Sequence, residues 1–187
     1  LIHNRALGRP QFISIEFRRN LLKENANHHR LKNPLLVDMA IHHFDLMRWI
    51  LQDEPTEIYC RTWNPVNSPY EDMPSAAAVI RFASGTMVAY QGSWVSTGKP
   101  TYWAGEWRME CDEGQIAWTS RAGGSDSARR DRLAVKAVGK QVRLVLEMVV
   151  LLLYDLFFLV RFESEARSEE LAHTNRRFCL DCDVFWN

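Results

Sequence analysis

The sequence has 187 residues, and its 23 Lys and Arg balance 23 Asp and Glu, so the formal net charge is zero. A nucleic-acid-binding module needs an excess of Lys or Arg on at least one face to neutralise phosphates, and the balanced charge argues against that class. The composition, 47% hydrophobic and 25% charged, is globular and excludes disordered and collagen-like chains. The length predicts one domain that needs no disulfide or metal to fold.

The first predicted elements are a strand, a loop and a helix. Residues 12–18 alternate apolar and polar side chains, which is the pattern of a strand with one buried face. Residues 20–34 are polar with little periodicity, which predicts a loop. Loops this long are uncommon and usually have a functional role. Residues 35–51 repeat apolar side chains at three- and four-residue spacing, which predicts an amphipathic helix.

A series of short strands follows the helix. Short links at residues 84–85 and 113–114 predict that two neighbouring pairs are antiparallel hairpins. Together the elements predict an α/β (α+β) fold, a predominantly antiparallel mixed sheet with its helices on one face and the other face open. The predicted strands are residues 57–63, 76–82, 86–95, 106–111 and 115–119, with 133–138 as a further candidate.

The segment at residues 144–160 is almost wholly apolar apart from Glu147 and Asp155. Its apolar residues favour a membrane span by about 4 to 9 kcal/mol, but the two acids oppose it by about 5 to 7 kcal/mol. Its longest run without a charge is seven residues, far below the ~20 that a span needs. We therefore expect a buried helix or strand here and no membrane. The polar residues 163–177 are expected to be helical or disordered.

The cysteines do not form the pattern of a secreted, disulfide-linked domain. Cys60 and Cys111 lie alone in strand-like runs, which predicts buried thiols. Cys179 and Cys182 form a C-x-x-C pair, which cannot complete a four-ligand zinc site and is expected to be reduced. The N-terminal residues contain no basic segment leading into a short apolar run, so we expect no secretory signal and a cytoplasmic protein.

The predicted helix carries a group of polar residues that suits proton transfer. Asp38 and His42 are four residues apart, so they lie one turn apart on the same side. A carboxylate there can accept the imidazole N–H and make His42 a general acid/base near neutral pH. Two alternatives stay open. Asp38 could serve the helix dipole with His42 in the core, or His42, His43 and Asp45 could bind a metal, although adjacent histidines point about 100° apart.

The same helix resembles one segment of a known family. Its Asp, three residues, His, two residues, Asp spacing, formed by Asp38, His42 and Asp45, resembles the second domain of the Gfo/Idh/MocA oxidoreductases, which include glucose-fructose oxidoreductase and inositol dehydrogenase. The likeness covers about residues 1–138. It is carried by residues 6–10, 34–49, 92–94 and 101–108.

The resemblance implies roles for individual residues. His42 matches the family's proton-transfer histidine, which takes the hydroxyl proton as hydride leaves for a nicotinamide, and Asp38 matches the acidic residue grouped with it. Other members bind sugars, inositols and similar polyols. The resemblance therefore suggests substrate-pocket candidates, each of which could instead be structural or solvated: Arg19, His28, Asn64 and Trp94.

The resemblance also implies an oligomer. The open face of this domain's sheet often makes the family's dimer or tetramer contacts, so we expect a homo-oligomer through that face. Seven Trp is a high count for this length, and large aromatics are enriched at pockets and interfaces. We therefore expect the Trp excess to lie on the open face.

The sequence departs from the family in the cofactor domain. No G-x-G-x-x-G follows a strand, as NAD(P) binding in a Rossmann unit requires, and the family's Glu-Lys-Pro lysine has no counterpart. The parent enzyme is expected to use NAD or NADP, while this chain alone binds no cofactor, holds no metal and is inactive in hydride transfer. Residues 1–140 are predicted to be the substrate-binding domain, and residues 141–187 a divergent segment of the same domain.

The leading hypothesis is thus the substrate-binding domain of an NAD(P)-dependent oxidoreductase that acts on a sugar or polyol hydroxyl. A non-catalytic module for ligand binding or oligomerisation is the first alternative. A metal-dependent hydrolase that uses the His/Asp cluster of the helix is the second.

Overall fold

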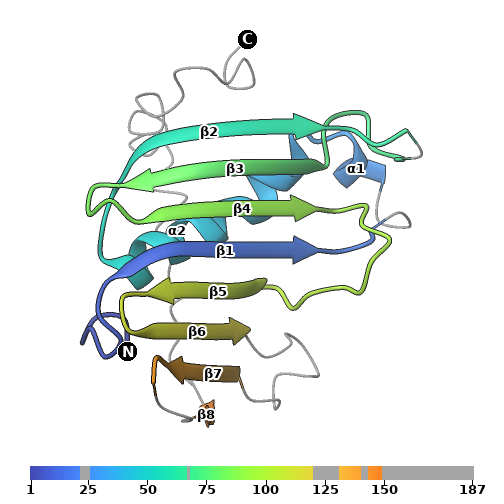
Figure 1. Ribbon diagram of the computed structural model, residues 1–187. Coiled ribbons are helices and arrows are strands. Elements are labelled where there is room, and N and C mark those ends of the chain that lie inside the picture. Colours follow the sequence, from blue (N-terminus) through green and yellow to red (C-terminus); the bar gives the residue numbers. More distant parts are fainter. Residues whose placement is uncertain (22–25, 67, 120–130, 140–142, 149–187) are drawn as a thin grey trace, which may run out of the picture.

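The computed structural model describes residues 1–21, 26–66, 68–119, 131–139 and 143–148 (Figure 1). One strand precedes the helices and the other strands follow them. In chain order the elements are β1 (Pro10–Arg18), α1 (Ala26–His29), the π-helix η1 (Leu35–Ala40), α2 (Ile41–Leu51), β2 (Pro55–Trp63), β3 (Ser75–Phe82), β4 (Met87–Ser93), β5 (Glu106–Cys111), β6 (Gly114–Thr119), β7 (Asp131–Ala137) and β8 (Arg143–Met148).

The strands form one mixed sheet in the order β2-β3-β4-β1-β5-β6-β7-β8. Among the described strands, β1 and β4 are the parallel pair, and the other neighbours are antiparallel. The predicted fold class and both predicted hairpins, β3–β4 and β5–β6, are therefore confirmed. Residues 144–148 of the apolar C-terminal segment extend the sheet as part of β8. The rest of that segment, the polar residues 163–177 and the C-x-x-C pair lie outside the described residues.

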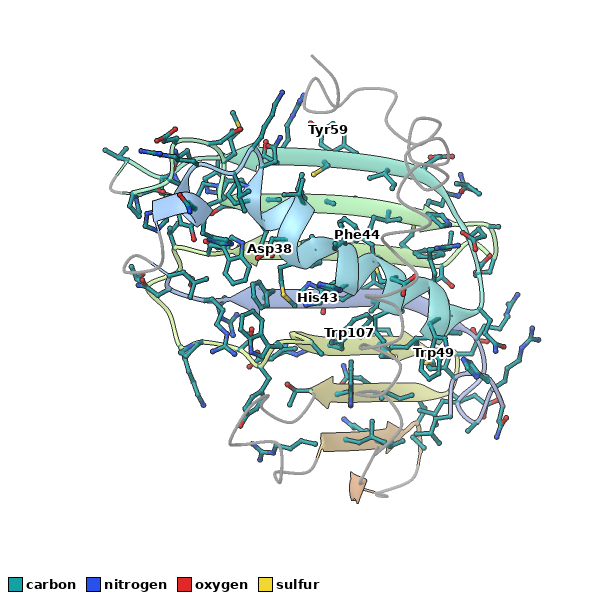
Figure 2. All side chains as sticks on the ribbon, turned by 180° about the vertical axis from the view of Figure 1, so that it is seen from behind. Asp38, His43, Phe44, Trp49, Tyr59 and Trp107 are labelled. Atoms are coloured by element: carbon teal, nitrogen blue, oxygen red, sulfur yellow. The ribbon has the colours of Figure 1, made fainter. Side chains whose placement is uncertain are left out.

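The helix predicted at residues 35–51 is present and lies across one face of the sheet (Figure 2). Its first six residues are wound as a π-helix rather than an α-helix. Leu35, Leu46 and Met47 turn toward the sheet and are buried. The helix comes close to β4 because Gly92 has no side chain, since a Cβ there would lie 2.9 Å from a Leu35 methyl carbon.

The core fills the space between the helix and the sheet. Alternate residues of β1, which are Ile13, Ile15 and Phe17, are at most 1% exposed, as the period-two pattern predicts. Tyr90 of β4 and Trp107 of β5 continue this buried layer on either side. The strongest alternation in the sequence therefore belongs to the strand that ends up in the middle of the sheet.

The face of the sheet that turns away from the helix carries exposed apolar side chains. Phe12, Tyr59 and Val79 are 42%, 55% and 48% exposed, and Figure 1 views the molecule from this side, with α2 behind the sheet. The prediction that the Trp excess lies here is wrong for the described residues, because indoles fill space on the helix side instead. Trp63 lies on the open face, whereas Trp94 and Trp107 are buried, Trp118 packs beside Trp107, Trp49 lies on α2 and Trp103 follows β4.

Cys60 and Cys111 form no disulfide among the described residues, and each is only partly buried. Cys60 lies on β2 at the edge of the sheet, and Cys111 is the last residue of β5, so neither is covered on all sides. Across the described residues, no helix has the length and apolar character that crossing a bilayer requires.

Candidate functional site

Asp38 lies in the π-helical turn that begins the long helix, with its carboxylate toward solvent (Figure 2). Its Oδ2 is 3.1 Å from Nε2 of His28, which extends from the short helix α1. The other ring nitrogen of His28, Nδ1, is 3.1 Å from the hydroxyl of Tyr70. A carboxylate can only accept, so Nε2–H donates to Asp38, and in a neutral ring Nδ1 then accepts from the Tyr70 O–H.

His42 follows Asp38 by four residues, in the first turn of α2, and is partly buried. The hydrogen bond that the structure gives to the Asp38 carboxylate comes from His28. Direct contact between Asp38 and the His42 ring stays a prediction, as does the acid/base role of His42. Asp45, the third residue of the motif, is exposed and lies 3.7 Å from the Arg48 guanidinium.

The substrate candidates from the sequence lie in one continuous set of contacts. The His28 ring centre is 5.6 Å from that of Trp94, and Trp94 is 5.9 Å from Trp103. The guanidinium of Arg19 lies 4.7 Å above the Trp103 ring, a cation–π contact. Asn64 does not reach the rings directly, but it donates to the backbone carbonyl of Tyr70 at 2.8 Å. We call this set the site cluster: Arg19, His28, Asp38, Asn64, Tyr70, Trp94 and Trp103.

Two N–H groups of the site cluster are buried without a hydrogen-bond partner among the described residues, Arg19 Nε and Trp94 Nε1. Burial also lowers the pKa of Arg19 below its ordinary value. No carboxylate of the described residues forms an ion pair with this guanidinium. Leaving a buried donor unsatisfied costs about 1–3 kcal/mol, so both groups favour an acceptor at this position.

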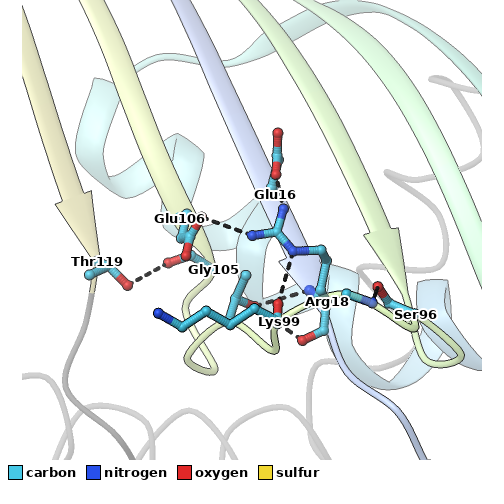
Figure 3. A network of polar contacts seen from close by, with 9 residues as sticks. Glu16, Arg18, Ser96, Lys99, Gly105, Glu106 and Thr119 are labelled. Carbon is cyan, nitrogen blue, oxygen red and sulfur yellow. Dashed lines mark hydrogen bonds and ion pairs between the residues drawn. The ribbon is translucent and has the colours of Figure 1, made fainter.

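The loop that carries Trp103 is held by the end of β1. Arg18 and Thr101 exchange backbone contacts, with the Thr101 N–H donating to the Arg18 carbonyl at 2.9 Å and the Arg18 N–H donating to the Thr101 hydroxyl at 3.0 Å. The Arg18 side chain donates to the Lys99 carbonyl at 3.1 Å and pairs with Glu16 and Glu106 (Figure 3). These contacts hold the loop against the end of β1, and the loop in turn sets the position of Trp103.

His43 lies on the inner side of the helix and belongs to the core, not to a metal site. It is 1% exposed, its Nδ1 is 3.0 Å from the Tyr90 hydroxyl, and its Nε2 donates to the Trp103 carbonyl at 2.8 Å. Burial lowers the pKa of His43 from 6.5 to about 4, although the bond to Trp103 opposes this change. Both nitrogens are occupied, and no three His, Cys, Asp or Glu of the described residues lie close enough to hold a metal ion. The metal-dependent hydrolase therefore gains no support.

The connection between β1 and the helix does not fit a dinucleotide. NAD(P) sites of the Rossmann type place glycines in a tight turn that leads directly from a strand to a helix N-terminus. Residues 19–34 contain no glycine, and they hold α1 together with Arg19 and His28 of the site cluster instead. This connection therefore lacks the glycine turn that holds a dinucleotide in a Rossmann unit.

Comparison with known proteins identifies the fold. Residues 1–117 match the family model described as the GFO/IDH/MocA C-terminal domain. The chain belongs to the Gfo/Idh/MocA family. The resemblance seen in the helix motif is thus confirmed, and the Gfo/Idh/MocA match includes every residue of the site cluster.

The relatives of this Gfo/Idh/MocA domain are longer proteins. The uncharacterized protein y4oX of Sinorhizobium fredii is 33% identical over 46% of this chain and 24% of its own length. The uncharacterized oxidoreductase YrbE of Bacillus subtilis is 29% identical over 50% of this chain and 28% of its own length. The chain thus spans about a quarter of these relatives. An inositol dehydrogenase homolog from Azotobacter vinelandii, solved with NADH and myo-inositol, shares the fold (TM-score 0.62, 17% identity, 78% of this chain and 37% of that one).

The structure also places two residues in the site cluster that were not among the candidates. Tyr70 lies in the irregular connection between β2 and β3, yet it is only 4% exposed. Trp103 lies in the long connection between β4 and β5. Neither position belongs to a periodic pattern. Trp103 lies in one of the segments that carry the family resemblance, residues 101–108, whereas Tyr70 is marked only as an aromatic residue in a polar loop.

Proposed function

We propose that this chain is the substrate-binding domain of an NAD(P)-dependent oxidoreductase that acts on a sugar or polyol hydroxyl. The observation that carries the proposal is the site cluster, which joins Asp38 of the motif helix to the Arg19 and Trp94 donors through ring contacts. Family membership and a structural neighbour solved with myo-inositol support this substrate class. The hydride acceptor binds outside the described residues.

In this proposal His42 carries the proton. A neutral imidazole accepts the proton of the substrate hydroxyl as the carbonyl forms, and returns it in the reverse direction. The Arg19 and Trp94 N–H groups lack partners among the described residues and would donate to substrate oxygens. The Trp103 ring is 41% exposed and would add apolar surface to the pocket beside the Arg19 guanidinium that lies over it.

We also propose a cytoplasmic homo-oligomer that associates through the open face of the sheet. The support is the group of exposed apolar residues there, Phe12, Tyr59 and Val79. Covering such side chains is favourable, and the opposite face of the sheet is already covered by η1 and α2.

The experiment compares His42→Ala with a matched control, His3→Ala, in a protein that carries this chain after an NAD(P)-binding domain. His3 is exposed and lies beside Trp49, at the far end of the helix. We expect His42→Ala to lower kcat for a polyol by about 10²–10⁴-fold and His3→Ala to leave it unchanged. An unchanged kcat in a folded His42→Ala protein would refute the proposal and support the non-catalytic binding module.

A further inference from the structure

His28 has no ring nitrogen left for a substrate. Nε2 lies 3.1 Å from Oδ2 of Asp38 and Nδ1 lies 3.1 Å from the Tyr70 hydroxyl, and the ring lies edge-on to Trp94 at a centroid distance of 5.6 Å. A neutral imidazole has one donor and one acceptor, and both are used within the protein. A histidine in this state cannot also bind a substrate hydroxyl through its nitrogens.

We propose that His28 is a positioning residue that acts through Asp38, and that Tyr70 fixes its tautomer. This inference rests on the proposed function, in which Asp38 stands beside the proton-transfer histidine. It assigns His28 a different role from the substrate contact that the family resemblance suggests. The linear arrangement Tyr70–His28–Asp38 holds one carboxylate oxygen and leaves the other, Oδ1, without a partner among the described residues.

The far end of this arrangement is anchored in the protein interior. Tyr70 is 4% exposed, its carbonyl accepts from Asn64 at 2.8 Å, and its N–H donates to the Ser68 hydroxyl at 3.1 Å. His29 packs against the Tyr70 ring at 4.7 Å. Exposure then rises along the series, from Tyr70 through the His28 side chain at 20% to the Asp38 side chain at 46%. A fixed, buried group thus sets the orientation of a solvent-facing carboxylate.

The first test measures the tautomer of His28 in the full chain by long-range ¹⁵N–¹H NMR of the imidazoles. We expect the Nε2–H form in the wild type, and a shift toward a mixture of tautomers in Tyr70→Phe, which lacks the donor to Nδ1. His43 is an internal control, because its own partners, Tyr90 and the Trp103 carbonyl, are untouched by this change. An Nδ1–H form or an even mixture in the wild type would overturn the proposal.

The second test is a double-mutant cycle on kcat in the protein that also carries an NAD(P)-binding domain. By analogy with the groups that orient metal ligands, whose removal costs about 10–100-fold in activity, His28→Leu should lower kcat by about 10-fold with KM within twofold. His28→Gln keeps an N–H near Nε2 and should restore most of the rate. In an Asp38→Asn background, His28→Leu should add less than about twofold, because two residues that act as a unit are not additive.

The outcomes separate the two proposals. A rise in KM without a fall in kcat, or an undiminished effect of His28→Leu in the Asp38→Asn background, would overturn the positioning role and make His28 a substrate contact. An unchanged kcat in His42→Ala would refute the proposed function instead. The tautomer measurement needs neither cofactor nor substrate, so it decides the His28 arrangement even if the variants fold poorly.

Discussion

The buried imidazole of His43 makes a quantitative prediction about stability and pH. Its pKa falls from 6.5 in the unfolded chain to about 4 in the folded one, chiefly because burial disfavours the charged ring. Between these two values the unfolded state binds more protons than the folded state, so the free energy of unfolding rises with pH. Above pH 6.5 the His43 ring is neutral in both states and costs no stability. As the pH falls from 6.5 toward 4, the free energy of unfolding decreases, because the unfolded chain takes up a proton that the buried ring does not. At about 1.4 kcal/mol for each pH unit, the loss at pH 4 is about 3 kcal/mol.

The assay is urea unfolding followed by Trp fluorescence at several pH values between 4 and 7.5. We expect wild type to lose about 3 kcal/mol more stability over this range than His43→Gln, whose amide can still meet Tyr90 and the Trp103 carbonyl but does not titrate. The control, His3→Gln, changes an exposed histidine and should follow wild type. Carboxylates titrate equally in all three proteins, so the difference between proteins isolates His43.

Two results would refute this reasoning about His43. One is an equal loss of stability in wild type and His43→Gln between pH 7 and pH 4. The other is an NMR titration in which the wild-type His43 ring takes up its proton near pH 6.5. The second measurement uses unaltered protein, so it stands even if His43→Gln unfolds.

Two further predictions concern packing and the N-terminal segment. Gly92→Ala places a Cβ 2.7 Å from the Tyr90 hydroxyl and 2.9 Å from a Leu35 methyl carbon, whereas the nearest atom at Gly98 is 3.6 Å away. We expect about 1–3 kcal/mol of destabilisation at the first site and under about 0.5 at the second, from urea midpoints, and equal midpoints would contradict the close packing around Gly92. Asp112 accepts from the Arg9 N–H at 2.8 Å, a bond that lowers the pKa of Asp112. Asp112→Ala should therefore speed hydrogen exchange at the Arg9 amide, and unchanged protection there would exclude this anchor.

The elements that the sequence predicts correctly are those whose burial has a regular period. In β1, the apolar residues Ile13, Ile15 and Phe17 alternate with polar ones because one face of the strand is buried. This period of two can be recognised directly in the sequence. The helix at residues 35–51 follows from its apolar spacing in the same way. The π-helical start is not visible in this pattern, because Leu35 and Met39 face the sheet in either winding.

The site is less accessible to such reasoning because its contacts join distant segments. Asp38 and His42 are identifiable from one helical turn, but the His28–Asp38 bond depends on how α1 folds back over the helix. Tyr70 joins them from the connection after β2, where no periodicity marks a buried residue. The prediction for the Trp residues was wrong because composition counts indoles without saying which face of a sheet they cover.

The place of β1 in the sheet has a consequence for how the chain acquires its structure during synthesis. Both partners of β1 come much later in the chain, since Phe12 pairs with Met87 on one side and Glu16 with Glu106 on the other. A nascent chain therefore exposes an apolar strand with two unpaired edges until β4 and β5 have been made. Such long-range pairings fold slowly and invite association with other chains. The middle of the sheet therefore cannot be completed until residues 87–111 have been synthesised.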